Sequence, residues 1–597
     1  MTCGNVRVRF RQTPQPIYNA RLLCSETTEF NVIRPTMILA CLMVAGVFAA
    51  PAAAQDLTPK QAAPSIKLVH PGWKRFYVDL DYILGLTTKE EQKQLPQLKE
   101  FGFDPFLVGV GGERPLGIDT LTDAKTLRYL AFIPISDLKK FRKDNLEAAD
   151  IESKKLGKTL YRLRDEFEVW GFLQFQNDYA AISGKRADVP AAIADPRPAY
   201  EKLVAKYDLV LEILNSQHSE AAQKVRKQQY DANIRKELFA MVERTKLETD
   251  DQFELRKLFT DIQLDELGRL YVGAKQARLG LVIDEKQADV STMDFLLDPI
   301  PETELAASVQ LLAKKSSDFA NIARNEDAIL SARINHPLDE MRQQNFVKLS
   351  LLLRKQAQQE FDKETDATKE EKQNRKKATD LFFDMIDAGL KSGVVDAFAE
   401  AHPSENGKNT IVGGILAVDG NAFIEALKLF PKASKGQKVE LNVDEAGDVK
   451  IHKFTAATKE HALFNDFFGS DVIYLGTSKK AVWYAAGENA LVELKAAITK
   501  CGEPNTGKAD DPVADVVIKL GPWMKLRQAL HAGDDEDEEL LKLRQFAVDA
   551  FLVGDDSLKL NLKRVGDHVE GLMTGQPGIL RFIGKMMADF SKENFDD

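Results

Sequence analysis

The sequence predicts an α+β protein made of two divergent copies of one mostly antiparallel sheet module, with helices packed on one face and with helical insertions. The first observation behind this prediction is a pair of matching segments. Residues 179–193 read YAAISGKRADVPAAI, and residues 484–498 read YAAGENALVELKAAI. The other two observations are strand-like patterns that recur around both segments and two long stretches rich in helix-forming residues.

Apolar, β-branched runs flank both matching segments and predict strands. Upstream lie residues 169–176 (VWGFLQFQ) and 471–478 (DVIYLGTS), and downstream lie residues 208–214 (DLVLEIL) and 515–520 (DVVIKL). We therefore expect Tyr-Ala-Ala to end a strand and Ala-Ala-Ile to form the buried face of a short helix after it. A ligand-binding role for Tyr179 and Tyr484 is the alternative.

Further out, a strand followed by a capped helix is predicted twice, at residues 126–141 and 409–427. Ser136 or Asp137 caps the first helix and Asp419 or Asn421 the second, because such side chains accept hydrogen bonds from the free N–H groups of a helix start. Alternating strands around a polar turn predict hairpins at residues 277–297, 441–454 and 557–575.

Two insertions are predicted to be helical. Residues 215–265 are rich in Ala, Lys, Glu, Leu and Gln and contain neither Pro nor Gly. The second insertion spans about residues 337–402, and seven of its apolar residues recur at helical spacing as one face. They are Leu381, Phe382, Met385, Ile386, Leu390, Val394 and Phe398. Residues 362–377 are charged on all sides, which predicts a solvated helix or loop, with a partner-binding arm as the alternative.

The two copies are expected at residues 55–315 and 316–597, after an export signal. Residues 37–54 (MILACLMVAGVFAAPAAA) carry no charge and end in small residues, which is the pattern of a signal peptide, cleaved here after Ala54. Because a signal peptide rarely starts so late, residues 1–36 are interpreted as a mis-assigned upstream extension; a long basic n-region is the alternative. The expected product is periplasmic or secreted, without a stable membrane span. An uncleaved N-terminal anchor is the other possibility.

The composition is that of an acidic, folded protein. The chain has 597 residues, of which 44% are hydrophobic and 29% charged, and its formal net charge is −10. Residues 1–54 contain five Arg and two Glu, so their removal leaves a more acidic chain. This charge disfavours nucleic acid as a partner, since nucleic-acid binders present basic surfaces.

We assign no catalytic, cofactor-binding or metal-binding residue from the sequence. No two histidines have the spacing of a helical zinc site; they are His70, His218, His336, His402, His452, His461, His531 and His568. Residues 534–539 (DDEDEE) are interpreted as the acidic start of a helix, with calcium binding as the alternative. Residues 109–117 (GVGGERPLG) are interpreted as a turn, because Arg114 replaces the third glycine of a dinucleotide-binding loop. Cys501 is interpreted as structural or incidental.

The segment MILACLMVAGVFAAPAAAQ, followed by the paired YAA…AAI segments, resembles the large exported two-copy α+β proteins of planctomycete-type bacteria. This resemblance of layout covers most of residues 37–597, implies no assigned activity and brings no functional residues. We expect a non-enzymatic envelope protein with a binding or structural role, whose partner is an envelope protein or a hydrophobic ligand. One alternative is a carrier of a hydrophobic molecule or lipid, with an apolar cavity lined by some of the 33 Phe. The other is a hydrolase with residues converging around His452, His461 or His568.

Overall fold

Twenty antiparallel strands form one sheet in this protein, whose computed structural model describes residues 62–595 with short gaps. The gaps are residues 124–125, 166–167, 245–247, 313, 326, 366, 406, 435, 456–461, 509–510 and 531–537. The predicted α+β class with an antiparallel sheet is confirmed. The expected signal peptide lies outside the described residues. Within them, no helix combines the length and the apolar character that crossing a bilayer requires.

The first ten strands lie before residue 300. Their bounds are β1 (Ser65–His70), β2 (Leu116–Asp123), β3 (Thr126–Pro134), β4 (Glu152–Lys155), β5 (Leu160–Arg164), β6 (Gly171–Gln176), β7 (Tyr179–Ser183), β8 (Leu209–Leu214), β9 (Ala274–Ile283) and β10 (Ser291–Pro299). Hydrogen bonds place them in the order β4-β5-β6-β7-β3-β2-β1-β8-β9-β10.

The second ten strands are paired in the same way. Their bounds are β11 (Leu330–Pro337), β12 (Val394–Pro403), β13 (Asn409–Leu416), β14 (Lys438–Ala446), β15 (Val449–Thr455), β16 (Val472–Thr477), β17 (Ala481–Ala486), β18 (Ala514–Lys519), β19 (Ser557–Val565) and β20 (His568–Gly575). Their order is β14-β15-β16-β17-β13-β12-β11-β18-β19-β20. Pairing of β10 with β20 joins the two sets into one ladder, with β4 and β14 at its edges.

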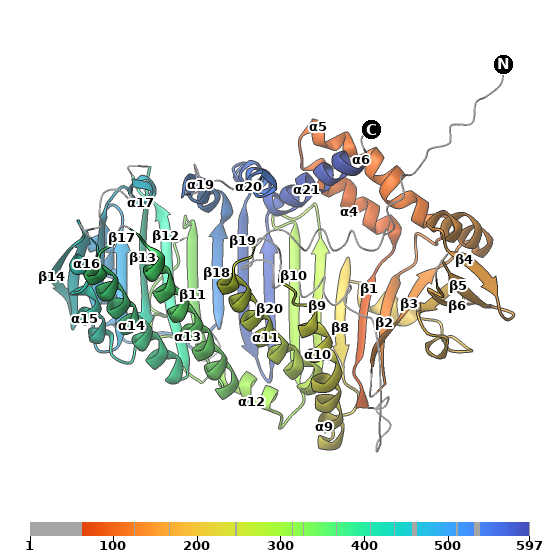
Figure 1. Cartoon of the computed structure of the whole chain (residues 1–597), viewed down its shortest axis with the longest axis horizontal. Coiled ribbons are helices and arrows are strands. Elements are labelled where there is room, and N and C mark those ends of the chain that lie inside the picture. Colours follow the sequence, from red (N-terminus) through yellow and green to blue (C-terminus); the bar gives the residue numbers. More distant parts are fainter. Residues whose placement is uncertain are drawn as a thin grey trace.

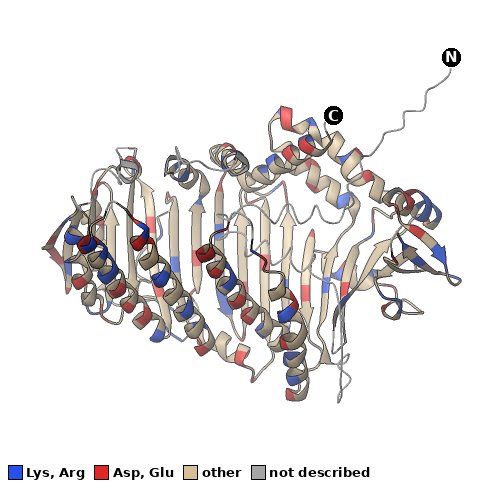
Figure 2. Ribbon diagram, in the orientation of Figure 1, with Lys and Arg blue, Asp and Glu red and all other residues tan. Residues whose placement is uncertain are grey.

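Helices connect the strands and cover much of the sheet. Their bounds are α4 (Trp73–Gly85), α5 (Lys89–Gln92), α6 (Gln94–Gln97), α7 (Leu138–Lys140), α8 (Arg197–Val204), α9 (Glu220–Gln229), α10 (Arg235–Ala240), α11 (Asp250–Gly273), α12 (Glu304–Leu311), α13 (Glu340–Lys363), α14 (Lys369–Lys391), α15 (Phe423–Leu427), α16 (Phe430–Ala433), α17 (Ala462–Phe468), α18 (Ala490–Cys501), α19 (Leu520–Leu530), α20 (Glu538–Phe551) and α21 (Pro577–Phe595). Figure 1 shows α11, α13 and α14 in front of the sheet and α17, α19, α20 and α21 along its upper edge. Charged residues are dense on the front helices and sparser on the strands in this view (Figure 2).

Helices pack on both faces of the sheet, which corrects the expectation of helices on one face. Val482 and Trp483 are neighbours in β17 and therefore point to opposite faces. Val482 belongs to a buried cluster with Met385 of α14, whereas Trp483 packs in a cluster with Leu494 of α18. Because β13 and β17 are covered on both sides, their sequences are nearly continuous apolar runs, without polar alternation.

The helix that follows each set of strands packs on the other set. Val309 of α12, the helix after β10, lies in one buried cluster with Val569 of β20. Leu580 of α21, the helix after β20, packs in turn with Ile283 of β9. Ala588 of α21 also belongs to the core cluster of α4. The two halves of the chain are thus interlocked through their terminal helices as well as through the sheet.

The matching Tyr-Ala-Ala segments lie in corresponding strands but in different registers. Tyr179 is the first residue of β7 and pairs with Pro134 at the end of β3. Ala481 is the first residue of β17 and pairs with Leu416 at the end of β13. Tyr484 therefore lies three residues further along its strand than Tyr179 does. Only the second Tyr-Ala-Ala ends a strand, and the first begins one.

The predicted helix caps and hairpins are confirmed. Asp137 accepts a hydrogen bond from the N–H of Lys140, and Asp419 accepts one from the N–H of Asn421. The three expected hairpins are β9–β10, β14–β15 and β19–β20. The expectation for Ala-Ala-Ile is wrong for the first copy, because residues 191–193 are irregular, whereas residues 496–498 lie in α18.

The expected helical face between residues 381 and 398 is too long. Helix α14 ends at Lys391, and Val394 and Phe398 belong to strand β12. Gly393 adopts a φ of +83°, a conformation that favours glycine and terminates helices. The charged residues 362–377 span the end of α13 and the beginning of α14.

Candidate functional site

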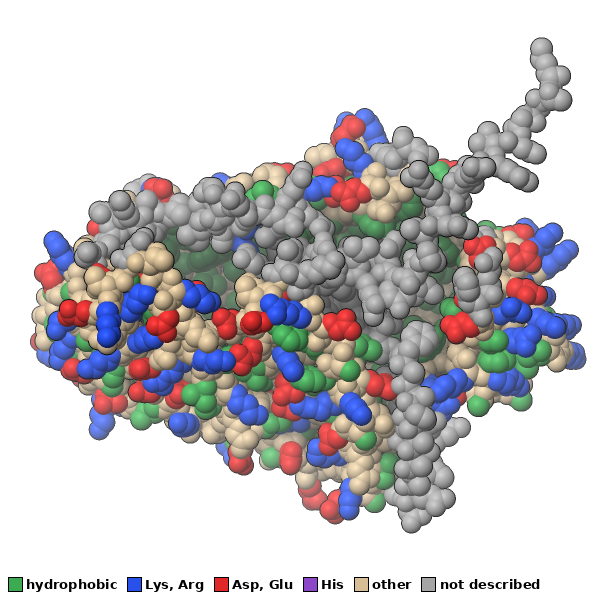
Figure 3. Space-filling view, viewed as in Figure 1, with side chains coloured by type: hydrophobic (Ala, Val, Ile, Leu, Met, Phe, Trp, Pro, Cys, Tyr) green, Lys and Arg blue, Asp and Glu red, His purple; other side chains and the backbone are tan. Residues whose placement is uncertain are grey.

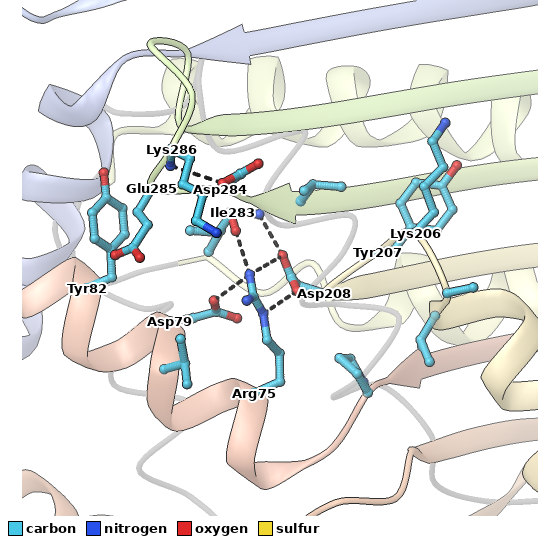
Figure 4. Close-up of a pocket in the computed structure, with 15 residues that line it drawn as sticks. Arg75, Asp79, Tyr82, Lys206, Tyr207, Asp208, Ile283, Asp284, Glu285 and Lys286 are labelled. Carbon is cyan, nitrogen blue, oxygen red and sulfur yellow. Dashed lines mark hydrogen bonds and ion pairs between the residues drawn. The ribbon is translucent and has the colours of Figure 1, made fainter.

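A cleft of about 500 Å³ opens between α4, the end of α8 with the start of β8, and the end of β9 with its turn toward β10. Figure 4 shows Arg75 between Asp79 and Asp208, with Tyr82 and Glu285 at one end and Lys206 and Tyr207 at the other. Seven charged side chains line it: Arg75, Lys206, Lys286, Asp79, Asp208, Asp284 and Glu285. Acidic groups therefore outnumber basic groups by one.

Gly72 allows α4 to begin beside the sheet. Its φ is +131°, and a Cβ at this position would lie 2.6 Å from the carbonyl oxygen of Gly112 and 2.7 Å from that of Arg114. Glycine is required where the backbone approaches so closely. The helix that starts at Trp73 then carries Arg75 and Asp79 one turn apart, on the side that faces the cleft.

Asp208 is fully hydrogen-bonded. Its Oδ1 accepts from Nε of Arg75 at 2.6 Å, and its Oδ2 accepts from Nη2 of Arg75 at 3.1 Å and from the backbone N–H of Ile283 at 2.6 Å. The paired guanidinium bonds give this contact a fixed geometry. Asp208 thereby joins α4, β8 and the end of β9.

Asp79 is only partly satisfied. Its Oδ1 lies 3.0 Å from Nη2 of Arg75, but that nitrogen also approaches Oδ2 of Asp208 at 3.1 Å and the carbonyl oxygen of Ile283 at 2.5 Å. Two hydrogens on one nitrogen serve three acceptors poorly. Asp79 is 7% exposed, and burial, together with the negative charge of Asp208, raises its pKa to about 7 against the opposing effect of Arg75. At neutral pH this carboxyl is divided between protonated and ionised forms.

Tyr207 forms a rigid wall at the other end of the cleft. Its hydroxyl donates to Oδ2 of Asp294 at 2.7 Å. Burial, and then this hydrogen bond, raise the pKa of Tyr207 to about 12. Its ring covers Gly280 of β9, where a Cβ would collide with it. Lys206 also reaches toward Asp294, with Nζ 3.5 Å from Oδ2, and its side chain is largely exposed.

A second hollow, of about 380 Å³, lies on the other side of α4, with Val78 between the two. Trp73 and Tyr77 line it together with Leu107 and Val110. The ring of Tyr77 is already occupied by the ammonium group of Lys99, 5.1 Å from the ring centre. This hollow therefore offers less free polar surface than the cleft beside Arg75.

The described histidines proposed for a hydrolase do not converge. His452 in β15 is buried and bonds Thr477 through Nε2 at 2.9 Å, and its Nδ1 accepts from the N–H of Asn442 at 3.1 Å. His568 in β20 contacts Glu570, and seven strands separate β20 from β15. His461 lies outside the described residues.

The tyrosines of the matching segments have structural surroundings. Tyr179 is fully buried and its hydroxyl donates to the carbonyl oxygen of Pro115 at 2.9 Å. Tyr484 lies over Gly413 of the neighbouring strand, where a Cβ would meet its ring. Neither ring lines the two hollows described above.

The remaining sequence candidates also have structural explanations. Burial, and then the charge of Asp396, raise the pKa of the Cys501 thiol to about 12, which disfavours the reactive thiolate. Within residues 109–117, Gly109 has a φ of +79° and Val110 forms a bridge with Ile135. Helix α20 begins at Glu538, whereas residues 534–537 lie outside the described chain. Among the described residues, no three His, Cys, Asp or Glu are arranged to hold a metal ion.

Sequence reasoning missed Arg75, Asp79 and Asp208. The i, i+4 spacing of Arg75 and Asp79 and the position of Asp208 before an apolar strand were the available signals. Both patterns are common in proteins, and only the fold brings residues from α4 and β8 together. The comparisons add no further guidance: no protein-family model, curated protein or solved structure matches the chain.

Proposed function

We propose that this chain is an exported, non-enzymatic envelope protein with a binding or structural role, made of two divergent copies of one ten-stranded module. The observation that carries the proposal is the repeated strand order. The ten strands from β1 to β10 are hydrogen-bonded to one another in the same order as the ten strands from β11 to β20. A duplication accounts for this repetition even though the two sequences differ, since the order of strands can be retained while individual residues change.

The continuous ladder supports a scaffolding role. Neighbouring strands lie about 4.8 Å apart, so a sheet of twenty strands spans roughly 90 Å along its hydrogen-bonding direction. The halves meet through the main-chain hydrogen bonds of β10 and β20. An extended platform of this kind presents large faces to a partner while keeping their spacing fixed.

Native mass spectrometry of the protein purified from the envelope of its own cells tests this proposal, together with sequencing of its N-terminus. We expect an N-terminus near Gln55 and a defined assembly with an envelope component. Recovery from the cytoplasm with an intact N-terminus would contradict export. Turnover of chromogenic ester, peptide or glycoside substrates, absent from a heat-denatured control, would contradict the non-enzymatic role.

One observation favours a carrier of hydrophobic molecules as a second candidate function. Strand pairing aligns an apolar row from β8 to β11: Leu209, Leu281, Met293, Met573, Leu560, Val516 and Ala332. Leu209 is 36% exposed and Leu560 is 38% exposed. Figure 3 shows hydrophobic side chains in the recess between the front helices and the upper edge. A carrier was expected to have a cavity lined by Phe. No Phe lines either described hollow, so this expectation gives the candidate no support.

Binding of a fluorescent fatty acid tests the carrier. We expect the wild-type protein to bind the probe and Leu560→Asp to lose most of that binding, because the substitution places a charge within the apolar row. Leu552→Asp is the matched control, since Leu552 is comparably exposed but lies beyond α20, outside the row. Equal binding by both variants, or no binding by the wild type, would exclude this candidate.

A further inference from the structure

The cluster of Arg75, Asp79 and Asp208 lacks one positive charge. One guanidinium faces two carboxylates. Asp208 accepts two hydrogen bonds from Arg75 and a third from the backbone N–H of Ile283. Asp79 receives only a share of Nη2 through its Oδ1. Its Oδ2 has no hydrogen-bond donor among the described residues, and the residue is 7% exposed. A largely buried carboxylate that opens onto the cleft is stabilised by a proton or by a cation.

The adjacent cleft provides room for a cation larger than a proton. Its volume of about 500 Å³ lies within the range of small-molecule sites. Val78, Val204 and Val282 supply aliphatic walls beside the charged cluster. We propose that this cleft binds a small primary ammonium compound, whose charged group pairs with Asp79 and whose aliphatic body packs on these valines.

The charges around the cleft favour a cation over an anion. Arg75 is held by Asp208, and Lys206 is directed toward Asp294. Asp284 and Glu285 add negative charge at the rim, where Lys286 is the remaining basic group. A primary ammonium group has three hydrogens to donate, so it can serve Oδ2 of Asp79 and further acceptors of the cleft together.

The ammonium group competes with the proton of Asp79. The other charged or titratable groups that line the cleft around this carboxyl are Arg75 and Tyr82 on α4, Lys206, Tyr207 and Asp208 around the start of β8, and Asp284, Glu285 and Lys286 in the turn after β9. Because the pKa of Asp79 lies at about 7, the ionised fraction rises about tenfold between pH 6 and pH 8. Binding is therefore expected to strengthen by up to about tenfold over this interval and to release a proton at the lower pH.

Isothermal titration calorimetry with n-butylammonium chloride tests the site in the whole protein. The controls are n-butanol, which has the same aliphatic body without charge, and butyrate, which has the opposite charge. We expect the ammonium compound alone to bind. We also expect its binding heat at pH 6 to depend on the ionisation enthalpy of the buffer, which reports proton release.

Two variants separate recognition from folding. Asp79→Asn keeps the shape of the side chain and is expected to weaken binding at pH 8 at least tenfold and to remove the pH dependence. Val78→Trp leaves the Arg75–Asp79 pair intact and is expected to weaken binding by filling the cleft from its exposed side. Asp81→Asn is the matched control, since Asp81 lies on the same helix with its side chain 51% exposed and does not line the cleft, and it is expected to retain most of the affinity.

Unchanged binding in Asp79→Asn, equal binding of n-butanol, or no ammonium binding by the wild type would overturn the site. These outcomes would leave the scaffolding proposal standing, because it rests on the strand order of the sheet and not on the cleft.

Discussion

The Asp79→Asn variant is expected to gain stability relative to the wild type as the pH rises from acidic to alkaline values. The folded state raises the pKa of Asp79 from its ordinary value of 3.8 to about 7. The protonated carboxyl therefore contributes stability that is complete below pH 3.8 and is lost as the pH rises through 7. Asn does not titrate, so it avoids this loss while still offering an oxygen to Arg75.

The magnitude follows from the linkage between protonation and folding. Between pH 5 and pH 7 the folded wild-type protein loses about 1.4 kcal/mol of stability for each pH unit, which gives a ceiling of about 3 kcal/mol. Water that enters the open cleft screens the charges and reduces this figure. We expect the advantage of the Asn variant to grow by about 1–2 kcal/mol between pH 5 and pH 8.

Urea denaturation of both proteins at several pH values, followed by a probe that reports on α4, measures this difference. Asp81→Asn provides the control, because Asp81 lies on the same helix with its side chain 51% exposed. The control is expected to show only a small difference from the wild type. A constant difference between Asp79→Asn and the wild type would refute the assignment of the buried, partly satisfied carboxyl.

Three further outcomes are expected. Gly280→Ala should destabilise the protein by about 1–3 kcal/mol in thermal unfolding, because the new Cβ collides with the ring of Tyr207. Gly389→Ala is the control and should be neutral or stabilising, because a Cβ at that position meets no atom within 4 Å. The thiol of Cys501, whose pKa burial raises to about 12, should react with a thiol reagent at pH 8 about a hundredfold more slowly in the folded than in the unfolded protein. Arg342→Ala should cost about 1–3 kcal/mol, since Arg342 of α13 donates two hydrogen bonds to Glu266 of α11; an unchanged denaturation midpoint would contradict this role.

The sequence predicts those features of the fold that depend on neighbouring residues. Asp137 and Asp419 were each one of two candidate caps, and they could be proposed because a capping bond involves only the next three residues. The hairpins were identifiable because alternation and a polar turn occur within one short segment. Which strands lie side by side was not identifiable, because the partners are far apart in the sequence. β1 lies between β2 and β8, and β20 pairs with β10 although nearly half of the chain separates them.

Register and burial account for the main errors. Tyr-Ala-Ala occurs in both β7 and β17. Where each strand starts is determined by its pairing with the end of β3 or β13, and not by the Tyr-Ala-Ala sequence itself. The apolar spacing that runs from Leu381 to Phe398 crosses a helix end, because a buried strand also supplies apolar residues at intervals that fit a helix. The candidate site could not be predicted for a related reason. In the sequence, Asp79 is indistinguishable from any acidic residue of an amphipathic helix, and only the fold brings Asp208 and the end of β9 beside it.

The packing of α21 on α4 also orders the events of folding. Leu80 and Leu84 of α4 share a buried cluster with Ala588, so one wall of the candidate cleft is supported by residues near the C-terminal end of the described chain. A nascent chain that emerges from its N-terminus has no such support until α21 is synthesised. A chain truncated before α21 is therefore expected to pack α4 less well. Formation of the cleft is thus expected to depend on α21, which is made long after α4.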